Sequence, residues 1–257
     1  MKYLTTEFSL PPGLPTGRVI REFLQLVFSN YRWFSPVRYG HFAVWNKNLD
    51  PERIDYDALI ALYEERHSLC VAARTDKDFI CIFPERPGSP ASPYSGRVLW
   101  EASARYSAKA SWRTAHVEQV TQLMGLLNSP LAVAALDEDH DRKTVRFVPS
   151  EDGIGSVQTF TVRNYNQGLA GLFWRNFFGP PFVRLFGERL ASLPEECRQS
   201  LGEELVLVQP YALPSDASTE QGEARERALI AHLGPECFYN HTHHTPPTRL
   251  PVLEPLP

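Results

Sequence analysis

The chain has 257 residues, 43% hydrophobic and 22% charged, a composition close to the globular average that excludes wholesale disorder. Its formal net charge of −4 gives no electrostatic reason to expect binding to nucleic acid or to an anionic membrane. There is no signal-peptide pattern at the N-terminus and no apolar run near the roughly 18 residues of a membrane span. We therefore expect a cytoplasmic protein with reduced cysteines.

The first half of the chain alternates predicted helices and strands. Thr16 is expected to cap a helix, because apolar residues recur at helical spacing from Val19 to Val27. Residues 30–40 break that pattern with aromatic residues and a proline. The expected elements are an extended segment at 1–14, helices from 16 and from about 55, a strand hairpin at 69–74 and 78–83, a loop at 84–96, a strand at 97–103 and a helix at 111–127.

The second half continues the mixture of helices and strands. A wholly apolar run at 131–136 is typical of a buried strand, and Pro180 is tolerated in the first turn of a helix. The other expected elements are strands at 144–148 and 157–163 around a turn at 152–155, a strand at 204–208, a helix at 218–233 and a proline-rich tail at 246–257.

The strands come partly in adjacent pairs, and no regular alternation of strand, helix and strand is visible. This order favours an α+β fold with at least one mostly antiparallel sheet packed by several helices. We expect residues 1–257 to form one compact domain.

The most charged short stretch contains four carboxylates around His140 and follows the apolar run at 131–136. One interpretation is a solvated loop. A second is an acidic surface that binds a basic cleft on a partner protein, and a third is a metal site, although no calcium-loop spacing is present. The four carboxylates are those of Asp137, Glu138, Asp139 and Asp141.

Motifs of nucleophilic, phosphate-binding or zinc-protease chemistry are absent from the sequence. His241, His243 and His244 are the weak candidates for metal binding, but a structural zinc site needs four ligands and Cys237 is the only nearby thiol. We expect no cofactor. The alternative is a metal-assisted hydrolase that uses the acidic stretch or this histidine cluster.

Aromatic residues gather with arginines in two places. The first group is Tyr31, Trp33 and Phe34 with two arginines, and the second surrounds Arg175 and Asn176. Such groups suit base stacking, a protein interface or a core, and the near-neutral charge disfavours nucleic acid. Core packing is the strongest interpretation for the second group.

The segment GLFWRNFFGPPFVRLFGERLASLP, from Gly171 to Pro194, resembles a hallmark stretch of the immunity protein 52 family. The resemblance covers about a tenth of the chain. Within it the family motif is carried by Trp174, Arg175, Asn176, Phe177, Phe178, Gly179, Pro180 and Pro181.

The resemblance implies a non-enzymatic cytoplasmic protein that binds and neutralises one cognate toxin encoded by an adjacent gene. In such systems, which include type VI secretion systems, the toxin is often a nuclease. The expected partner is therefore that toxin, with neither nucleic acid nor membrane as a partner. On this hypothesis the four carboxylates would contact the toxin.

Overall fold

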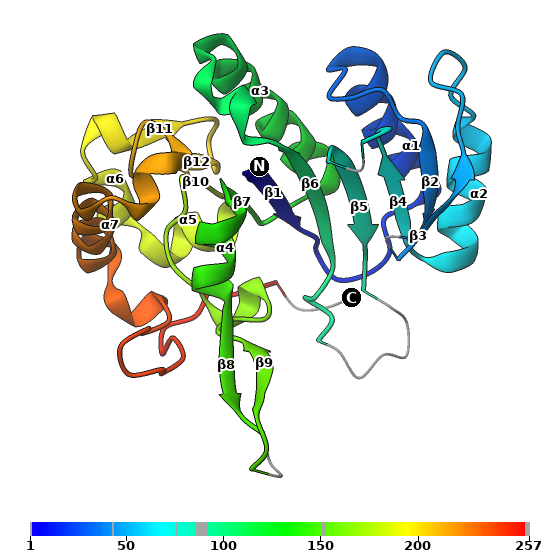
Figure 1. The fold of residues 1–257 in the computed structure, drawn as a ribbon. Coiled ribbons are helices and arrows are strands. Elements are labelled where there is room, and N and C mark those ends of the chain that lie inside the picture. The colour runs from blue at the N-terminus through cyan, green and yellow to red at the C-terminus, as the bar shows by residue number, and fades with distance from the viewer. Residues whose placement is uncertain (1, 43, 76, 86–91, 151–152, 255–257) are drawn as a thin grey trace. The chain divides into compact units, whose positions relative to one another are not determined.

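The computed structural model describes residues 2–42, 44–75, 77–85, 92–150 and 153–254 (Figure 1). The chain divides into two compact units, Met1–Ala132 and Val133–Pro257. The expectation of one domain over residues 1–257 stays a prediction. Several predicted segments fall partly outside the described residues: the hairpin turn at residue 76, the loop at 84–96 in residues 86–91, the turn at 152–155 in residue 152, and the tail at 246–257 in residues 255–257.

The first unit contains six strands that lie side by side, together with three α-helices. Its strands follow the order β1-β6-β5-β4-β2-β3, and each neighbouring pair is antiparallel. Helix α1 packs against both α2 and α3. The elements are β1 (Tyr3–Ser9), α1 (Gly17–Gln25), β2 (Arg38–His41), β3 (Val44–Asn48), α2 (Tyr56–Arg66), β4 (Leu69–Ala72), β5 (Phe79–Phe83), β6 (Arg97–Ser103) and α3 (Ala110–Leu127).

Side-chain caps explain where the first two helices begin. The hydroxyl of Thr16 accepts a hydrogen bond from the backbone N–H of Val19, and the carboxylate of Asp55 accepts one from Ala58 at 3.0 Å. Both interactions satisfy backbone donors that the first turn of a helix leaves unpaired. The predicted helices are confirmed at both positions, as is the hairpin of β4 and β5.

Three strands of the first unit were not predicted. β1 lies in the segment expected only to be extended, and it pairs with β6 along its whole length. Its Thr6 is buried and its hydroxyl lies 3.0 Å from Nε2 of the buried His116 on α3. β2 and β3 follow the aromatic break, where no period-two pattern marks them.

The second unit contains four strands that lie side by side and a separate two-stranded hairpin. The four strands follow the order β11-β12-β10-β7, and the hairpin joins β8 to β9. Strands and helices together confirm the predicted α+β class. The elements are β7 (Leu131–Leu136), α4 (Asp137–Thr144), β8 (Val145–Pro149), β9 (Ser156–Phe160), β10 (Arg175–Phe178), α5 (Pro180–Phe186), α6 (Glu188–Ala191), β11 (Arg198–Ser200), β12 (Val206–Val208) and α7 (Glu220–Leu233).

The core of the second unit is built from aromatic rings. The ring centroids of Phe178 and Phe182 lie 5.7 Å apart, and those of Phe178 and Phe186 lie 5.3 Å apart. Trp174 is fully buried, and its indole N–H donates to the carbonyl of Ala212 at 3.2 Å. These contacts make the aromatic run before α5 part of the hydrophobic core of this unit.

Replacing Trp174 by Ala should therefore lower the free energy of unfolding by about 3–5 kcal/mol, because a fully buried aromatic side chain is lost. Chemical denaturation measures the change directly. Val252→Ala is the control, since this side chain is 79% exposed and should change stability by no more than about 0.5 kcal/mol. Equal stability of the two variants would show that the indole does not hold the core together.

Candidate functional site

The acidic stretch is helix α4, so the predicted loop is wrong. The helix carries Asp137, Glu138 and Asp139 in its first turn and Arg142 and Lys143 in its last. Negative charge near the N-terminus and positive charge near the C-terminus both stabilise a helix through its dipole. The order of charges along this stretch, acids first and bases last, therefore stabilises the helix itself.

Two charged side chains of α4 point into the second unit. Asp139 is 6% exposed and Lys143 is 5% exposed, and the Nζ of Lys143 lies 3.1 Å from Oδ2 of Asp139. The same Nζ lies 2.8 Å from Oε2 of Glu226 on α7. It also donates to the carbonyl oxygen of Leu172. All three N–H donors of the ammonium are thus used.

The carboxylates of this ion cluster (Asp139, Lys143 and Glu226) are satisfied as well. The second oxygen of Asp139 accepts from Arg142 at 2.7 Å, and Oε1 of Glu226 accepts the backbone N–H of Leu172 at 3.1 Å. Gly171 lies against the cluster, where an added Cβ would be 3.2 Å from Glu226 Oε1. The cluster therefore joins α4, α7 and the Gly171–Leu172 backbone in one tightly packed arrangement.

The charges of the ion cluster act on the neighbouring titratable groups. Burial lowers the pKa of Arg142, but its hydrogen bond and charge interaction with Asp139 outweigh this and raise the pKa above its usual value. Burial, and then the charges of Asp139 and Glu226, raise the pKa of Tyr211. Arg142 therefore stays charged and Tyr211 stays neutral.

The structure separates the four predicted partner-binding carboxylates. Asp139 is used inside the unit, so it offers no charge to a partner. Glu138 is exposed, and the side chain of Asp141 is 74% exposed, with Oδ1 3.8 Å from Nδ1 of His140. Asp137 is half-buried. Glu138 and Asp141 are thus the two that present negative charge at the surface.

The family motif lies in and around β10. Trp174, Arg175, Asn176, Phe177 and Phe178 are all buried. The side-chain amide of Asn176 accepts from the N–H of Phe173 at 2.9 Å and donates to the carbonyls of Phe173 and Val208. The guanidinium of Arg175 lies 4.1 Å from the ring centroid of Trp174. These side chains organise the interior of the second unit.

The three histidines near the C-terminus do not converge. His241 donates from Nε2 to the carbonyl of Ala170 at 2.6 Å, His243 is exposed, and His244 has a left-handed backbone with φ of 53°. In the described part of the chain, no group of three His, Cys, Asp or Glu side chains is arranged to hold a metal ion. No described helix has both the length and the apolar character needed to cross a membrane.

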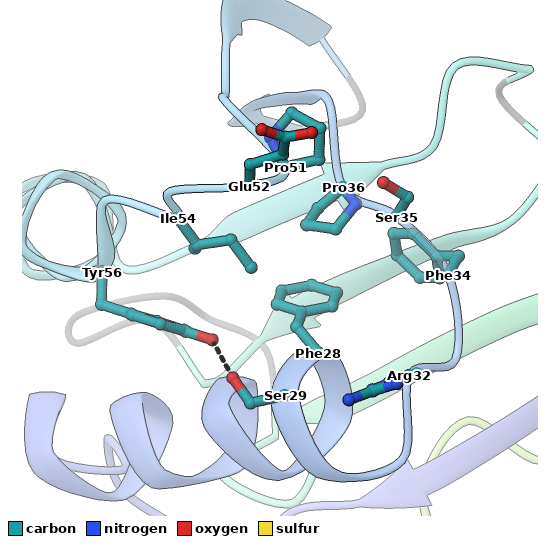
Figure 2. A pocket seen from close by; sticks show the side chains of 10 residues that line it. All are labelled: Phe28, Ser29, Arg32, Phe34, Ser35, Pro36, Pro51, Glu52, Ile54 and Tyr56. Carbon is teal, nitrogen blue, oxygen red and sulfur yellow. Dashed lines mark hydrogen bonds between the residues drawn. The ribbon is translucent and has the colours of Figure 1, made fainter.

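The first unit has a cavity of about 700 Å³, within the usual range of ligand pockets. It lies where α1 continues as a π-helical turn, Leu26–Asn30, and where Arg32 has a φ of 53°. π-helical turns and left-handed non-glycine residues are both frequent at functional sites. The lining residues, shown in Figure 2, are Phe28, Ser29, Arg32, Phe34, Ser35, Pro36, Pro51, Glu52, Ile54 and Tyr56.

The pocket has apolar walls and a charged margin. Phe28 and Phe34 meet edge to face at 5.3 Å, and Ile54 points toward them in Figure 2. Within the described ranges, neither the guanidinium of Arg32 nor the carboxylate of Glu52 has a charged partner. This geometry can accept an apolar side chain or small molecule with a polar end.

The remaining members of the first aromatic group are held within the first unit. The ring of Trp33 stacks on Trp100 with centroids 3.5 Å apart, and its indole N–H donates to Gln119 at 2.7 Å. The hydroxyl of Tyr31 donates to Gln122. Of the three aromatic residues in this group, Phe34 alone lines the pocket. The sequence did not predict the pocket, because Phe28, Ile54 and Tyr56 come from separate segments.

Comparisons with known proteins show a likeness at the level of the fold. No family model matches the chain, and no curated protein matches it. A solved structure of the Pseudomonas aeruginosa T6SS protein PA0821 has a similar fold, with a TM-score of 0.56 and 12% sequence identity. The match covers 90% of this chain and 72% of that one. At this identity the likeness shows the fold, and membership of the immunity protein 52 family stays a prediction.

Removing one carboxylate from the ion cluster should destabilise the protein. Glu226→Gln leaves the buried ammonium of Lys143 with one charged partner, and breaking a buried pair in this way costs about 3–5 kcal/mol. Glu223→Gln on the same helix is the matched control, because Glu223 is half exposed and its ion pairs contribute about 1 kcal/mol or less. Urea denaturation of both variants compares the two losses. Losses of similar size would mean that the cluster does not anchor α4.

Proposed function

We propose that this protein is a non-enzymatic immunity protein that binds and neutralises a cognate toxin. The toxin is a nuclease effector of a type VI secretion system or of a related polymorphic-toxin system, encoded by an adjacent gene. The likeness of the fold to a T6SS protein over 90% of the chain carries this proposal. The resemblance of residues 171–194 to the immunity protein 52 family supports it independently.

The charged groups of the second unit are compatible with a binding protein. Asp139, Lys143 and Glu226 neutralise one another in the interior, so they stabilise the scaffold and leave no carboxylate there for acid–base chemistry. The surface acids of α4 remain for a partner. Complementary charge on two proteins increases the rate of encounter and fixes their relative register.

The proposal predicts a stable complex with the toxin-like protein encoded beside this one. The two proteins should co-elute in size exclusion, bind with nanomolar affinity or better in titration calorimetry, and give a complex without nuclease activity, because complexes of enzymes with their protein inhibitors are among the tightest known. A folded, active partner that neither binds nor loses activity in the presence of this protein would refute the proposal. Stoichiometric metal in the untagged protein would then favour the hydrolase.

The exposed acids of α4 should contribute to that complex through charge. The double variant Glu138→Gln, Asp141→Asn should bind the toxin more weakly and with a smaller dependence of affinity on salt, because two favourable charge interactions are lost. Its thermal stability should fall only slightly, since both side chains are exposed and the charge of Glu138 contributes about 1 kcal/mol or less through the helix dipole.

A matched control for this variant is Glu203→Gln, Glu204→Gln, which removes the same charge from another exposed part of the second unit. Calorimetry at two salt concentrations tests all three proteins. If both double variants bind like the unmodified protein at both concentrations, α4 makes no electrostatic contact with the toxin.

A further inference from the structure

The β8–β9 hairpin is a two-stranded sheet that extends away from α4 and from the rest of the second unit (Figure 1). Val145 pairs with Phe160 at its base, and Pro149 pairs with Ser156 near its turn. The N–H of Thr161 donates to the carbonyl of Thr144 at 2.9 Å, which closes the base against the end of α4. The hairpin is therefore attached to a fixed helix at one end only.

Apolar side chains are exposed on this hairpin to an unusual degree. Among the described residues, eight large apolar side chains are exposed, and four of them lie here. Phe147 is 69% exposed, Ile154 82%, Val157 53% and Phe160 45%. Single exposed apolar residues need no explanation, but four of them on one short hairpin indicate an interaction surface.

The exposed side chains lie on both faces of the hairpin and at its turn. Residues directly opposite in an antiparallel pair share a face, and so do residues two apart on one strand. Phe160 lies opposite Val145, which is two residues before Phe147, so Phe147 and Phe160 project from the same face. Val157, opposite Val148, projects from the other, and Ile154 lies in the turn. A flat partner would cover one face and leave the other in water. A cleft that surrounds the hairpin would cover both faces and Ile154.

Two positively charged arginines lie near the base of the hairpin, so a complementary cleft needs negative charge there. Arg146 lies on β8, and the guanidinium of Arg163, just after β9, lies 6.0 Å from the ring of Phe160. Within the described part of the chain neither arginine forms an ion pair, and Nε of Arg146 is buried without a hydrogen-bond partner. Carboxylates at the mouth of the cleft would complement both guanidinium groups.

The hairpin also lacks the packing that usually stabilises such an element. β8 and β9 pair only with each other in the described sheets. An isolated two-stranded sheet is marginally stable in water unless another layer packs on it. Insertion into a partner would supply that layer on both faces.

We propose that the β8–β9 hairpin is the element of this protein that enters the active-site cleft of the cognate toxin, whose walls are apolar and whose mouth carries carboxylates. This inference rests on the proposed function and adds the mode of inhibition, which is occlusion of the cleft. Phe147, Ile154 and Val157 fill the cleft, and Arg146 and Arg163 pair with the carboxylates.

The test is calorimetric titration of the toxin-like protein encoded by the adjacent gene with the full chain and with the variants Ile154→Ser and Phe147→Ser. Each should weaken binding by about 100-fold, as expected for central apolar contacts in an interface. Inhibition of the toxin's catalytic activity should weaken in parallel. Ile154→Ser distinguishes a loss of binding from a loss of folding, because a side chain that is 82% exposed contributes little to the core.

Val252→Ser is the matched control, since Val252 is 79% exposed in the same unit but lies outside the hairpin. It should bind and inhibit like the unmodified protein. Unchanged melting temperatures for all variants would exclude unfolding as the cause of weaker binding.

The outcomes separate this inference from the function on which it rests. If the unmodified protein does not bind the toxin, the proposed function fails. If it binds and both hairpin variants bind equally well, the function stands and the hairpin inference is overturned. If the free protein is a dimer that the hairpin variants convert to a monomer, the occupant is a second copy of this chain, which also overturns the inference.

Discussion

The second unit depends on one interaction, the buried ammonium of Lys143 between the carboxylates of Asp139 and Glu226. An unpaired charge at this depth would cost several kcal/mol, whereas each donor of this ammonium has an acceptor. Rotating or sliding α4 would separate these partners at once. The cluster therefore fixes both the orientation of α4 and the position of α7 relative to the Gly171–Leu172 backbone.

A fixed α4 has consequences for everything that follows it in the chain. β8 begins at Val145, directly after the last residue of the helix, and Thr161 bonds to the carbonyls of Lys143 and Thr144. The hairpin thus starts from a rigid base, although its strands have no further support. Presenting apolar side chains from a rigid base reduces the conformational entropy that is lost when a partner orders them.

The sequence predicted elements whose signals are local, and it missed those that depend on distant partners. Helices capped by Thr16, Asp55 and Thr219 were found, because cap and apolar spacing lie within one turn of each other. Apolar spacing does not predict α4, because its eight residues contain no apolar side chain, although its acid-first, base-last order is a helix signal. The ion cluster could not be predicted from the sequence, because nothing near α4 in the sequence indicates that Glu226 lies next to Lys143.

The distribution of charge must therefore be judged from exposed groups. Residues 131–257 contain 17 acidic and 11 basic residues, and the acids include Asp139 and Glu226, whose charges are neutralised internally and cannot attract a partner. At the surface, α4 is acidic and the base of the adjoining hairpin is basic. A uniformly cationic cleft would complement α4 but repel Arg146 and Arg163. A partner that contacts both elements must instead combine apolar walls with positive and negative groups, as a catalytic cleft does when it holds both basic residues and carboxylates.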